Sequence, residues 1–263
     1  MNPGDTYGRW TVQERLGTGG AADVYRCTDG DEEAAIKLLR SVDPSDQQHR
    51  RLQREADILL RLSHPNIVKV RSIDLNARPA WLEMEFVRGQ HAGHLIRAGA
   101  AAPRTLRAVA EQLLEAMAYW HAQDIAHRDI KPGNLIVGPD GKLTVVDFNL
   151  ALDASLERLS GIGVRVGTFA YAPPEWIMEE AGDPRGWDVY GAGQVLWELA
   201  VGRRAFDAKL PMTQLMRSKM GINSLDPGER VAGDLRALIL SLTARNPAER
   251  PADGAEALAR LKP

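Results

Sequence analysis

A string of charged and amide side chains occupies the segment His127-Arg128-Asp129-Ile130-Lys131-Pro132-Gly133-Asn134, and Asp147 follows about one hairpin later. A carboxylate can accept a proton from a hydroxyl, and a lysine can neutralise phosphate charge. Asn and Asp oxygens can hold Mg²⁺. Transfer of a γ-phosphoryl group needs all of these together, because charge develops on the phosphate while an acceptor hydroxyl is held in line. The segment therefore predicts phosphoryl transfer from ATP.

These motifs resemble those of the protein kinase family, and the resemblance extends from Leu16 to about Arg250. It implies that Asp129 accepts the hydroxyl proton and that Lys131 lies beside the γ-phosphate. It also implies that Asn134 and Asp147 hold the metal ions. Lysine two residues after the catalytic Asp is typical of serine/threonine kinases rather than tyrosine kinases.

The fold implied by this resemblance is α+β and two-lobed. A small antiparallel β-sheet lobe with one helix is expected over residues 1–87, and a larger, mainly helical lobe over residues 88–263. Both belong to a single protein kinase domain spanning 1–263. The Ala, Arg and Leu usage and the Gly-Gly turn resemble bacterial serine/threonine kinases.

The residue pattern agrees with a change from strands to helices between Gly89 and Pro103. From Thr105 onward, apolar residues recur at three- and four-residue steps as far as Trp120, which predicts a core-facing helix. Before the change, short β-type runs are separated by turn residues. These runs are Trp10 to Leu16, Asp23 to Thr28, Glu33 to Leu39, Val68 to Leu75 and Ala80 to Val87.

Composition excludes few classes of function. The 263 residues are 44% hydrophobic and 26% charged with a net charge of −2, which gives no electrostatic case for nucleic acid or an anionic membrane. No run approaches the roughly 18 apolar residues of a membrane span. The single cysteine, Cys27, cannot form an internal disulfide and fits a reducing compartment. If the chain is complete we expect it in the cytoplasm; if it is an excised domain, its tether is missing.

A glycine-rich turn, Gly17-Thr18-Gly19-Gly20, lies between two of the strand-like runs. Glycine lets backbone N–H groups approach phosphates without interference from Cβ. Ala22 stands where the kinase pattern has its third glycine. A P-loop is excluded because the terminal Gly-Lys-Ser/Thr is missing, and a dinucleotide-binding turn is excluded because a strand follows.

Lys37, in Ala34-Ala35-Ile36-Lys37, lies in an apolar strand and needs a partner. Glu55 falls on the apolar face of a predicted helix together with Leu52, Ala56 and Leu59, where a carboxylate is costly unless paired. The resemblance implies that Lys37 binds the α- and β-phosphates and that Glu55 holds it in place.

The resemblance further implies an apolar adenine slot, with Met84 as gatekeeper and Glu85 to Val87 as a hinge that offers backbone hydrogen bonds. The acid that often contacts ribose after the hinge is missing from Gln90-His91-Ala92-Gly93. The complete expected ATP-binding set is Leu16, Gly17, Thr18, Gly19, Gly20, Ala21, Ala22, Asp23, Val24, Ala35, Lys37, Met84, Glu85, Val87 and Ile136. The expected cofactor is Mg²⁺, with Mn²⁺ as an alternative ion.

The segment from Gly167 and Thr168 to Glu175 resembles the part of protein kinases that closes the activation loop and receives a protein substrate. Small-molecule kinases of the same broad fold lack the Tyr171 to Glu175 pattern, so a protein substrate is favoured. Asp188 matches a buried helix residue that braces the catalytic backbone, and Arg250 matches the partner of Glu175. Gly133 stands where kinases that prefer arginine often carry Glu.

Asn149 replaces the glycine of the family's Asp-Phe-Gly motif. Asn is one of the few other residues that readily adopt positive φ. We expect activity to be retained because Asp147 itself is intact. The alternative is a catalytically impaired, nucleotide-binding regulatory module. That alternative would be favoured by loss of Lys37, Asp129, Asn134 or Asp147, and none is lost.

Regulation by phosphorylation is expected from Arg128, which in related kinases meets a phosphate on the activation loop. Between Asp147 and Gly167 the hydroxyl residues are Ser155 and Ser160. We predict Ser160 as the principal autophosphorylation site and Ser155 as a secondary one. The alternative is a loop that is ordered without phosphate.

Overall fold

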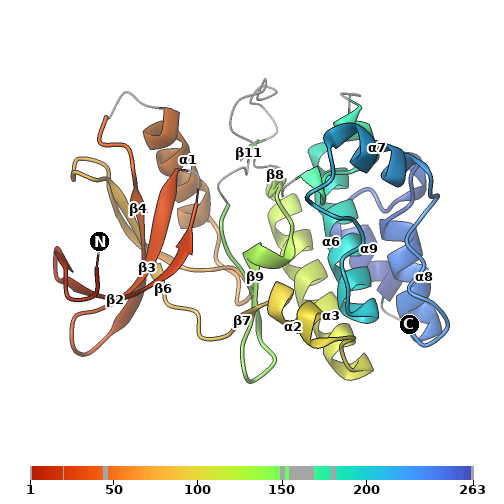
Figure 1. Ribbon diagram of the computed structural model, residues 1–263, viewed down its shortest axis with the longest axis horizontal. Helices are drawn as coiled ribbons and strands as arrows, with labels where there is room; N and C mark the ends of the chain where they lie inside the picture. Colours follow the sequence, from red (N-terminus) through yellow and green to blue (C-terminus); the bar gives the residue numbers. More distant parts are fainter. Residues whose placement is uncertain are drawn as a thin grey trace. The chain divides into compact units, whose positions relative to one another are not determined.

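The computed structural model describes residues 2–19, 21–43, 47–148, 152–153, 169–178 and 182–261 (Figure 1). The chain divides into two compact units. The first contains the residues up to Arg88 together with Asp147 and Phe148, and the second contains Gly89 to Val146 and the remainder of the chain. The two units are described separately.

The first unit is built on an antiparallel sheet in which six described strands follow the order β1-β2-β3-β4-β6-β5. A cluster of buried side chains from Trp10 to Leu38 forms a core on β2, β3 and β4. The strands are β1 (Thr6–Tyr7), β2 (Trp10–Thr18), β3 (Ala22–Thr28), β4 (Glu33–Leu39), β5 (Val70–Asp74) and β6 (Trp81–Glu85).

The two strands predicted over residues 68–75 and 80–87 are shorter in the structure. Asp74 is the last residue of β5, and its Oδ1 accepts the backbone N–H groups of Asn76 and Ala77. This side-chain turn replaces ladder hydrogen bonds, so pairing stops before the break.

One helix, α1 (Gln47–Arg61), belongs to the first unit and packs on β5 and β6. Its buried face carries Leu52, Ala56 and Leu59, as the periodicity predicts, and Glu55 lies on the same face with 1% exposure. The spacing of three and four residues places these side chains in one stripe.

The second unit is mainly helical, and α3, α6, α8 and α9 pack against one another (Figure 1). Its helices are α2 (Ala92–Ala98), α3 (Pro103–His121), α5 (Pro174–Ile177), α6 (Pro184–Val201), α7 (Met212–Met220), α8 (Gly233–Leu242) and α9 (Gly254–Leu261), with 3₁₀ turns η1 (Pro132–Asn134) and η2 (Pro247–Glu249). The α+β fold class is confirmed.

The predicted helix after Thr105 is α3, and its apolar stripe from Leu106 to Trp120 is buried. Gly254 begins α9 against this helix. A Cβ at Gly254 would lie 2.4 Å from the backbone nitrogen of Ala118, so the two helices approach as closely as they do because this residue is glycine.

Short strands in the second unit hold the segments of chemical interest. β7 (Gln90–His91), β9 (Leu135–Val137) and β10 (Leu143–Val145) form one sheet, and β8 (Ile125–Ala126) pairs with β11 (Leu152–Asp153). Across the described parts of the chain, no helix combines the length and the apolar character that crossing a bilayer requires.

Candidate active site

Lys37, Glu55 and Asp147 form a charged cluster in the first unit. Lys37 Nζ lies 2.7 Å from both carboxylate oxygens of Glu55 and 2.8 Å from Oδ1 of Asp147. Lys37 is central in β4, where it pairs with Val24 of β3 and Leu82 of β6, and it is 7% exposed. Lys37 thus contacts Glu55, which is 18 positions away in the sequence, and Asp147, which is 110 positions away.

Electrostatics keep this lysine charged. Burial disfavours the ammonium, but the charges of Asp147 and Glu55 outweigh that effect and hold the pKa of Lys37 above its ordinary value. Burial, with the nearby Asp147 charge, raises the pKa of Glu55 to about 7 although Lys37 opposes it. The result is one cation that faces two carboxylates.

The glycine-rich turn connects β2 to β3, and its geometry depends on Gly19. The Gly19 N–H donates to the Ala22 carbonyl at 2.7 Å, and a Cβ at Gly19 would lie 2.7 Å from that oxygen. A Cβ at Gly17 would meet nothing within 4 Å. Ala22 is 5% exposed, so alanine is accommodated at the third-glycine position.

The neighbouring members of the predicted ATP-binding set belong to the same hairpin. Leu16 and Thr18 lie in β2, with the Leu16 side chain exposed, and the carbonyl of Ala21 accepts from Arg40 N–H. Asp23 forms an ion pair with Arg40 at 2.7 Å, and this hydrogen bond lowers the pKa of Asp23. Gly20 lies outside the described residues.

The predicted adenine slot is represented in the first unit by Val24, Ala35 and Met84. Ala35 pairs with Met84 across β4 and β6, and Lys37 lies on the same side of β4 as Ala35 because strand side chains alternate. The Glu85 N–H donates to the Lys69 carbonyl, so the backbone of Glu85 can offer a ligand only its carbonyl oxygen. Val87 follows β6, and Ile136 lies in β9 of the second unit.

In the second unit, Asp129 is held by three neighbours. Lys131 Nζ lies 2.5 Å from Asp129 Oδ2, and the amide nitrogen of Asn134 lies 3.1 Å from the same oxygen and 2.8 Å from the Asp129 carbonyl. The Asp129 N–H donates to His127 Nδ1 at 3.2 Å, so the proton of that ring is on Nε2, which faces the Val146 carbonyl. The carboxylate therefore has a fixed orientation.

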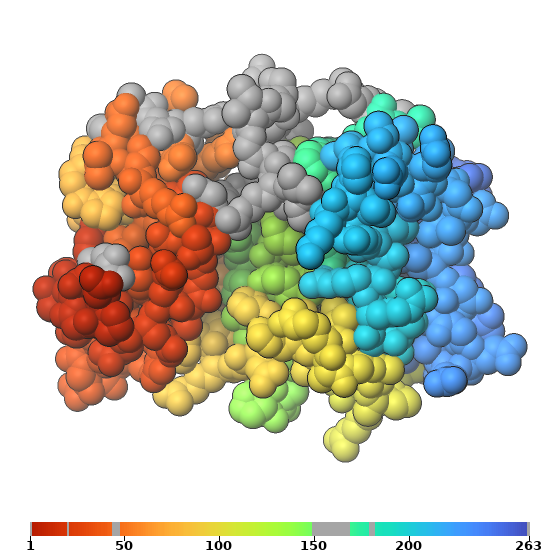
Figure 2. Space-filling view, viewed as in Figure 1, coloured from red at the N-terminus to blue at the C-terminus, as the bar shows by residue number. Residues whose placement is uncertain are grey.

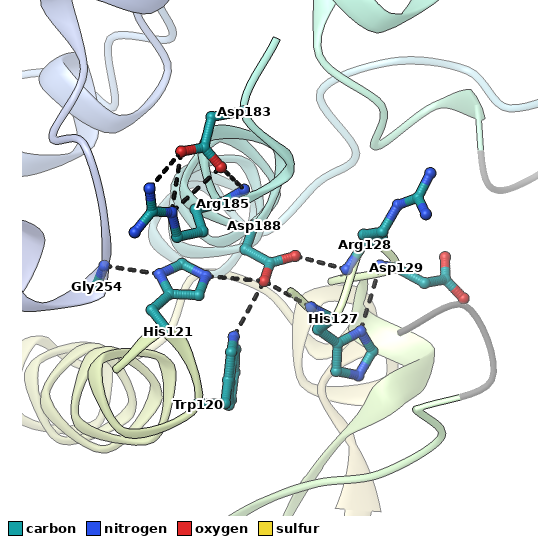
Figure 3. Close-up of polar contacts among 9 residues, drawn as sticks. All are labelled: Trp120, His121, His127, Arg128, Asp129, Asp183, Arg185, Asp188 and Gly254. Atoms are coloured by element: carbon teal, nitrogen blue, oxygen red, sulfur yellow. Dashed lines mark hydrogen bonds and ion pairs between the residues drawn. The ribbon is translucent and has the colours of Figure 1, made fainter. Parts of the chain in front are cut away.

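The backbone of this segment is anchored by Asp188 of α6 (Figure 3). The fully buried carboxylate accepts the N–H groups of His127 and Arg128 at 2.8 and 2.6 Å. It also accepts Trp120 Nε1 and His121 Nε2, each at 3.0 Å. Burial acts against its charge, but the His121 hydrogen bond and the other donors leave the pKa of Asp188 below its ordinary value.

The anchoring predicted for Asp188 is confirmed, and the two side-chain donors were not predicted. Trp120 was assigned only to the helix core, and nothing in the spacing distinguishes His121 from a surface residue. His121 Nδ1 accepts the Gly254 N–H at 2.9 Å, which places the ring proton on the nitrogen that faces Asp188.

The segment has a strained backbone at Arg128 and lies close to α6 at Ile130. Arg128 has a φ of 64°, a left-handed conformation that costs energy for a residue with a side chain. A Cβ at Gly191 would lie 2.9 Å from the Ile130 carbonyl, so glycine allows the backbones to touch. Asp147, in the first unit, also has a positive φ of 66°.

The predicted pair of Glu175 and Arg250 is confirmed. The guanidinium binds the carboxylate at 2.6 and 2.9 Å, and both side chains are almost completely buried. Asn149, Ser155, Ser160 and Thr168 lie outside the described residues. The guanidinium of Arg128 stacks on Trp187 with its carbon 4.8 Å from the ring centre.

The oxygen donors fit a hard divalent cation. Asn134 uses its amide nitrogen on Asp129, which leaves its carbonyl oxygen as the atom suited to a metal, and the Asp147 side chain is 38% exposed. Within the described ranges, no three His, Cys, Asp or Glu residues gather into a metal-binding group.

Comparison with known proteins agrees with this geometry. A family model described as the protein kinase domain matches residues 10–260. The chain belongs to the protein kinase family.

Three relatives illustrate the match. Over 97% of this chain, 33% of residues are identical to the protein named "Probable serine/threonine-protein kinase pknA2" of Bifidobacterium longum, of which 35% is covered. Serine/threonine-protein kinases PknL of Mycobacterium tuberculosis and PrkC of Bacillus subtilis are each 32% identical, over 93% and 92% of this chain. The chain spans 63% of PknL and 38% of PrkC. The predicted membership of the protein kinase family is confirmed, and each of these relatives is named as a serine/threonine-protein kinase.

Proposed function

We propose that this chain transfers the γ-phosphoryl group of ATP to serine and threonine hydroxyls of protein substrates. The observation that carries the proposal is the contact of Lys37 with both Glu55 and Asp147. A buried lysine paired with a buried carboxylate has no structural advantage over apolar residues, because desolvation of the Lys37 and Glu55 charges is expensive. A phosphate ligand that needs the cation explains why a lysine stands at this position.

Each residue has a defined part in the proposal. Lys37 binds the α- and β-phosphates, and Glu55 holds the ammonium in place. Asp129 orients the acceptor hydroxyl and takes its proton, while Lys131 neutralises charge on the transferred group. Asn134 and Asp147 hold Mg²⁺, which when bound neutralises charge on the phosphate oxygens.

The test is transfer of labelled γ-phosphate from Mg-ATP to a generic protein and to the chain itself. Asp129→Asn should lower the rate at least about a hundredfold, roughly 2.7 kcal/mol of barrier. Asp140→Asn is the matched control, because Asp140 is exposed in the turn between β9 and β10 and Asn can still accept the Lys142 N–H. A folded Asp129→Asn variant with full activity would show that Asp129 does not take the hydroxyl proton and would refute the proposed mechanism. Replacing Mg²⁺ by Mn²⁺ or EDTA in the same assay tests the metal.

Autophosphorylation is proposed at Ser160, with Ser155 secondary, from the sequence of the loop. In the described part of the chain, no carboxylate forms an ion pair with Arg128, whose guanidinium lies on Trp187. A phosphate would supply that partner. Mass spectrometry after incubation with Mg-ATP, together with kinetics of Ser160→Ala, tests this; an unmodified loop would refute it.

The proposed place of action is the cytoplasm, as part of a signalling pathway. Cys27, the only cysteine of the chain, is buried, and burial raises the pKa of its thiol to about 11. An inert thiol of this kind needs no oxidising compartment. Labelling of the chain in intact and fractionated cells tests the location.

A further inference from the structure

The second unit contains a cavity of about 800 Å³ next to the segment that carries Asp129. Its walls come from Lys131 to Gly133, from Ala170 and Tyr171, and from the stretch after α6 between Arg204 and Lys209. Figure 2 shows that stretch, in cyan, beside the yellow segment of α2. Lys131 contacts Asp129 at 2.5 Å, so the cavity begins one side chain from the proposed catalytic carboxylate.

The ionisable side chains of the cavity are mostly cationic. Lys131, Arg204 and Lys209 line it, against a single acid, Asp207. Asp207 Oδ1 accepts the backbone N–H of Lys209. Within the described ranges, no carboxylate forms an ion pair with the exposed Lys209 side chain. An anionic group entering the cavity would meet this ammonium without displacing an existing partner.

A fourth cation, Arg97 of α2, extends the basic wall beyond the lining residues. A Cβ built on Gly93 would lie 3.5 Å from Nη2 of Arg204, 3.6 Å from Nη1 of Arg97 and 3.7 Å from Cβ of Pro132. The two guanidinium groups thus converge beside Pro132, which lines the cavity. Burial, with the neighbouring charge of Arg97, lowers the pKa of Arg204. Like charges held together in this way favour an anion between them.

The buried acid behind Arg204 and Tyr171, Glu198, is already occupied by cation and hydroxyl donors. Glu198 is completely buried, and Arg204 Nη1 lies 3.1 Å from its Oε2 and also donates to the Tyr171 hydroxyl. Tyr171 donates to the same carboxylate oxygen at 2.8 Å. A substrate arginine would have to displace Arg204 and leave it unpaired, which opposes binding.

We propose that this cavity selects protein substrates with acidic side chains close to the phosphorylated serine or threonine, and that Lys209 and Arg97 determine that preference. The proposal rests on the proposed function, because the acceptor hydroxyl is placed at Asp129. An extended peptide advances about 3.3 Å per residue, so residues within a few positions of the acceptor reach the cavity.

Binding is measured without catalysis. The probes are fluorescent peptides with alanine at the acceptor position. Three Glu, three Gln or three Arg residues stand either directly before or directly after that alanine. Anisotropy titrations of the purified chain should give about tenfold tighter binding of a Glu peptide than of the Gln and Arg peptides, and the difference should shrink as salt is raised. Equal binding of the three, preference for Arg, or no binding of either Glu peptide overturns the proposal.

Charge reversal locates the site. Lys209→Glu and Arg97→Glu should each weaken the Glu peptide about three- to fivefold, as expected for one exposed ion pair lost. Lys142→Glu is the matched control, since it makes the same change at an exposed lysine of the same unit in the turn before β10. Equal effects of Lys209→Glu and Lys142→Glu would show a general charge effect and overturn the assignment.

Transfer assays separate the two proposals. With acceptor serine restored, kcat/KM should follow the same order of peptides, and Lys209→Glu should reduce it through KM. Acidic-peptide binding without any transfer would refute the proposed function and keep the selectivity of the cavity. Transfer with no preference among the peptides would keep the function and refute the selectivity.

Discussion

Oδ1 of Asp188 accepts the backbone N–H of Arg128 at 2.6 Å, and Arg128 at that point has a left-handed backbone. The two facts belong together, because the turn presents the consecutive N–H groups of His127 and Arg128 to one carboxylate. The hydrogen bonds offset the conformational cost of positive φ. The residue that precedes Asp129 is thereby fixed from inside the helical unit.

Asp188→Asn should destabilise the chain by about 1–3 kcal/mol, since an amide nitrogen must face one of the four donors that the carboxylate accepts. We expect transfer activity to fall at least about tenfold at temperatures where the variant is folded. Asp183→Asn is the control, because Asn caps α6 as well as Asp does. Urea denaturation and initial rates measure both effects; equal behaviour of the two variants would contradict the anchoring role.

Gly191→Ala should destabilise by about 1–3 kcal/mol, because its Cβ would lie 2.9 Å from the Ile130 carbonyl. Gly186→Ala changes another glycine of α6 where a Cβ meets nothing within 4 Å. That variant should be neutral or stabilised by up to about 1 kcal/mol. Thermal denaturation of Gly191→Ala and Gly186→Ala tests the close approach of Gly191 to Ile130, and similar melting temperatures of the two variants would refute it.

Lys37→Met should abolish transfer, at least about a hundredfold, because the phosphates lose their cation and two carboxylates lose their partner. Lys69→Met, an exposed lysine of the same unit, should leave the rate unchanged. Nucleotide affinity measured by calorimetry should fall in Lys37→Met alone. A folded Lys37→Met chain with normal turnover would remove the cluster from the mechanism.

The free energy of unfolding should decrease as pH rises from about 5 to about 7, because of the carboxyl group of Glu198. Burial raises the pKa of this carboxyl to about 7. The folded chain therefore binds a proton that the unfolded chain has already released, and stability is lost as pH rises through this window. Glu198→Gln should remove about 1–3 kcal/mol of the loss.

The Glu198 prediction is checked by urea denaturation at pH 5 and pH 8. Glu256→Gln serves as control, since Glu256 is exposed and its pKa is lowered by the Ala252 N–H and by Arg260. The Glu198→Gln variant should still lose some stability between pH 5 and pH 8, because the pKa of Glu55 is raised in the same direction. If the Glu198→Gln variant lost as much stability between pH 5 and pH 8 as the original chain, the pKa of Glu198 would not be raised.

Much of the chemistry was readable from the sequence, because it depends on residue types in a fixed local order. The segment from His127 to Asn134 folds into one turn whose members contact one another. Helical period likewise placed Glu55 on the buried face of α1. The pairing of Lys37 with Glu55 followed, since each buried charge needs a partner.

Tertiary structure alone decided the contacts that join distant segments. His121 and Trp120 reach Asp188 because α3 packs on α6, and Arg204 covers Glu198 because the chain turns back after α6. Helix packing, not local propensity, determines such encounters, and the same residue types elsewhere on a helix would remain solvated. The sequence by itself therefore determined which groups can do the chemistry. The packing determined which of them are held rigid and which charges surround the neighbouring cavity.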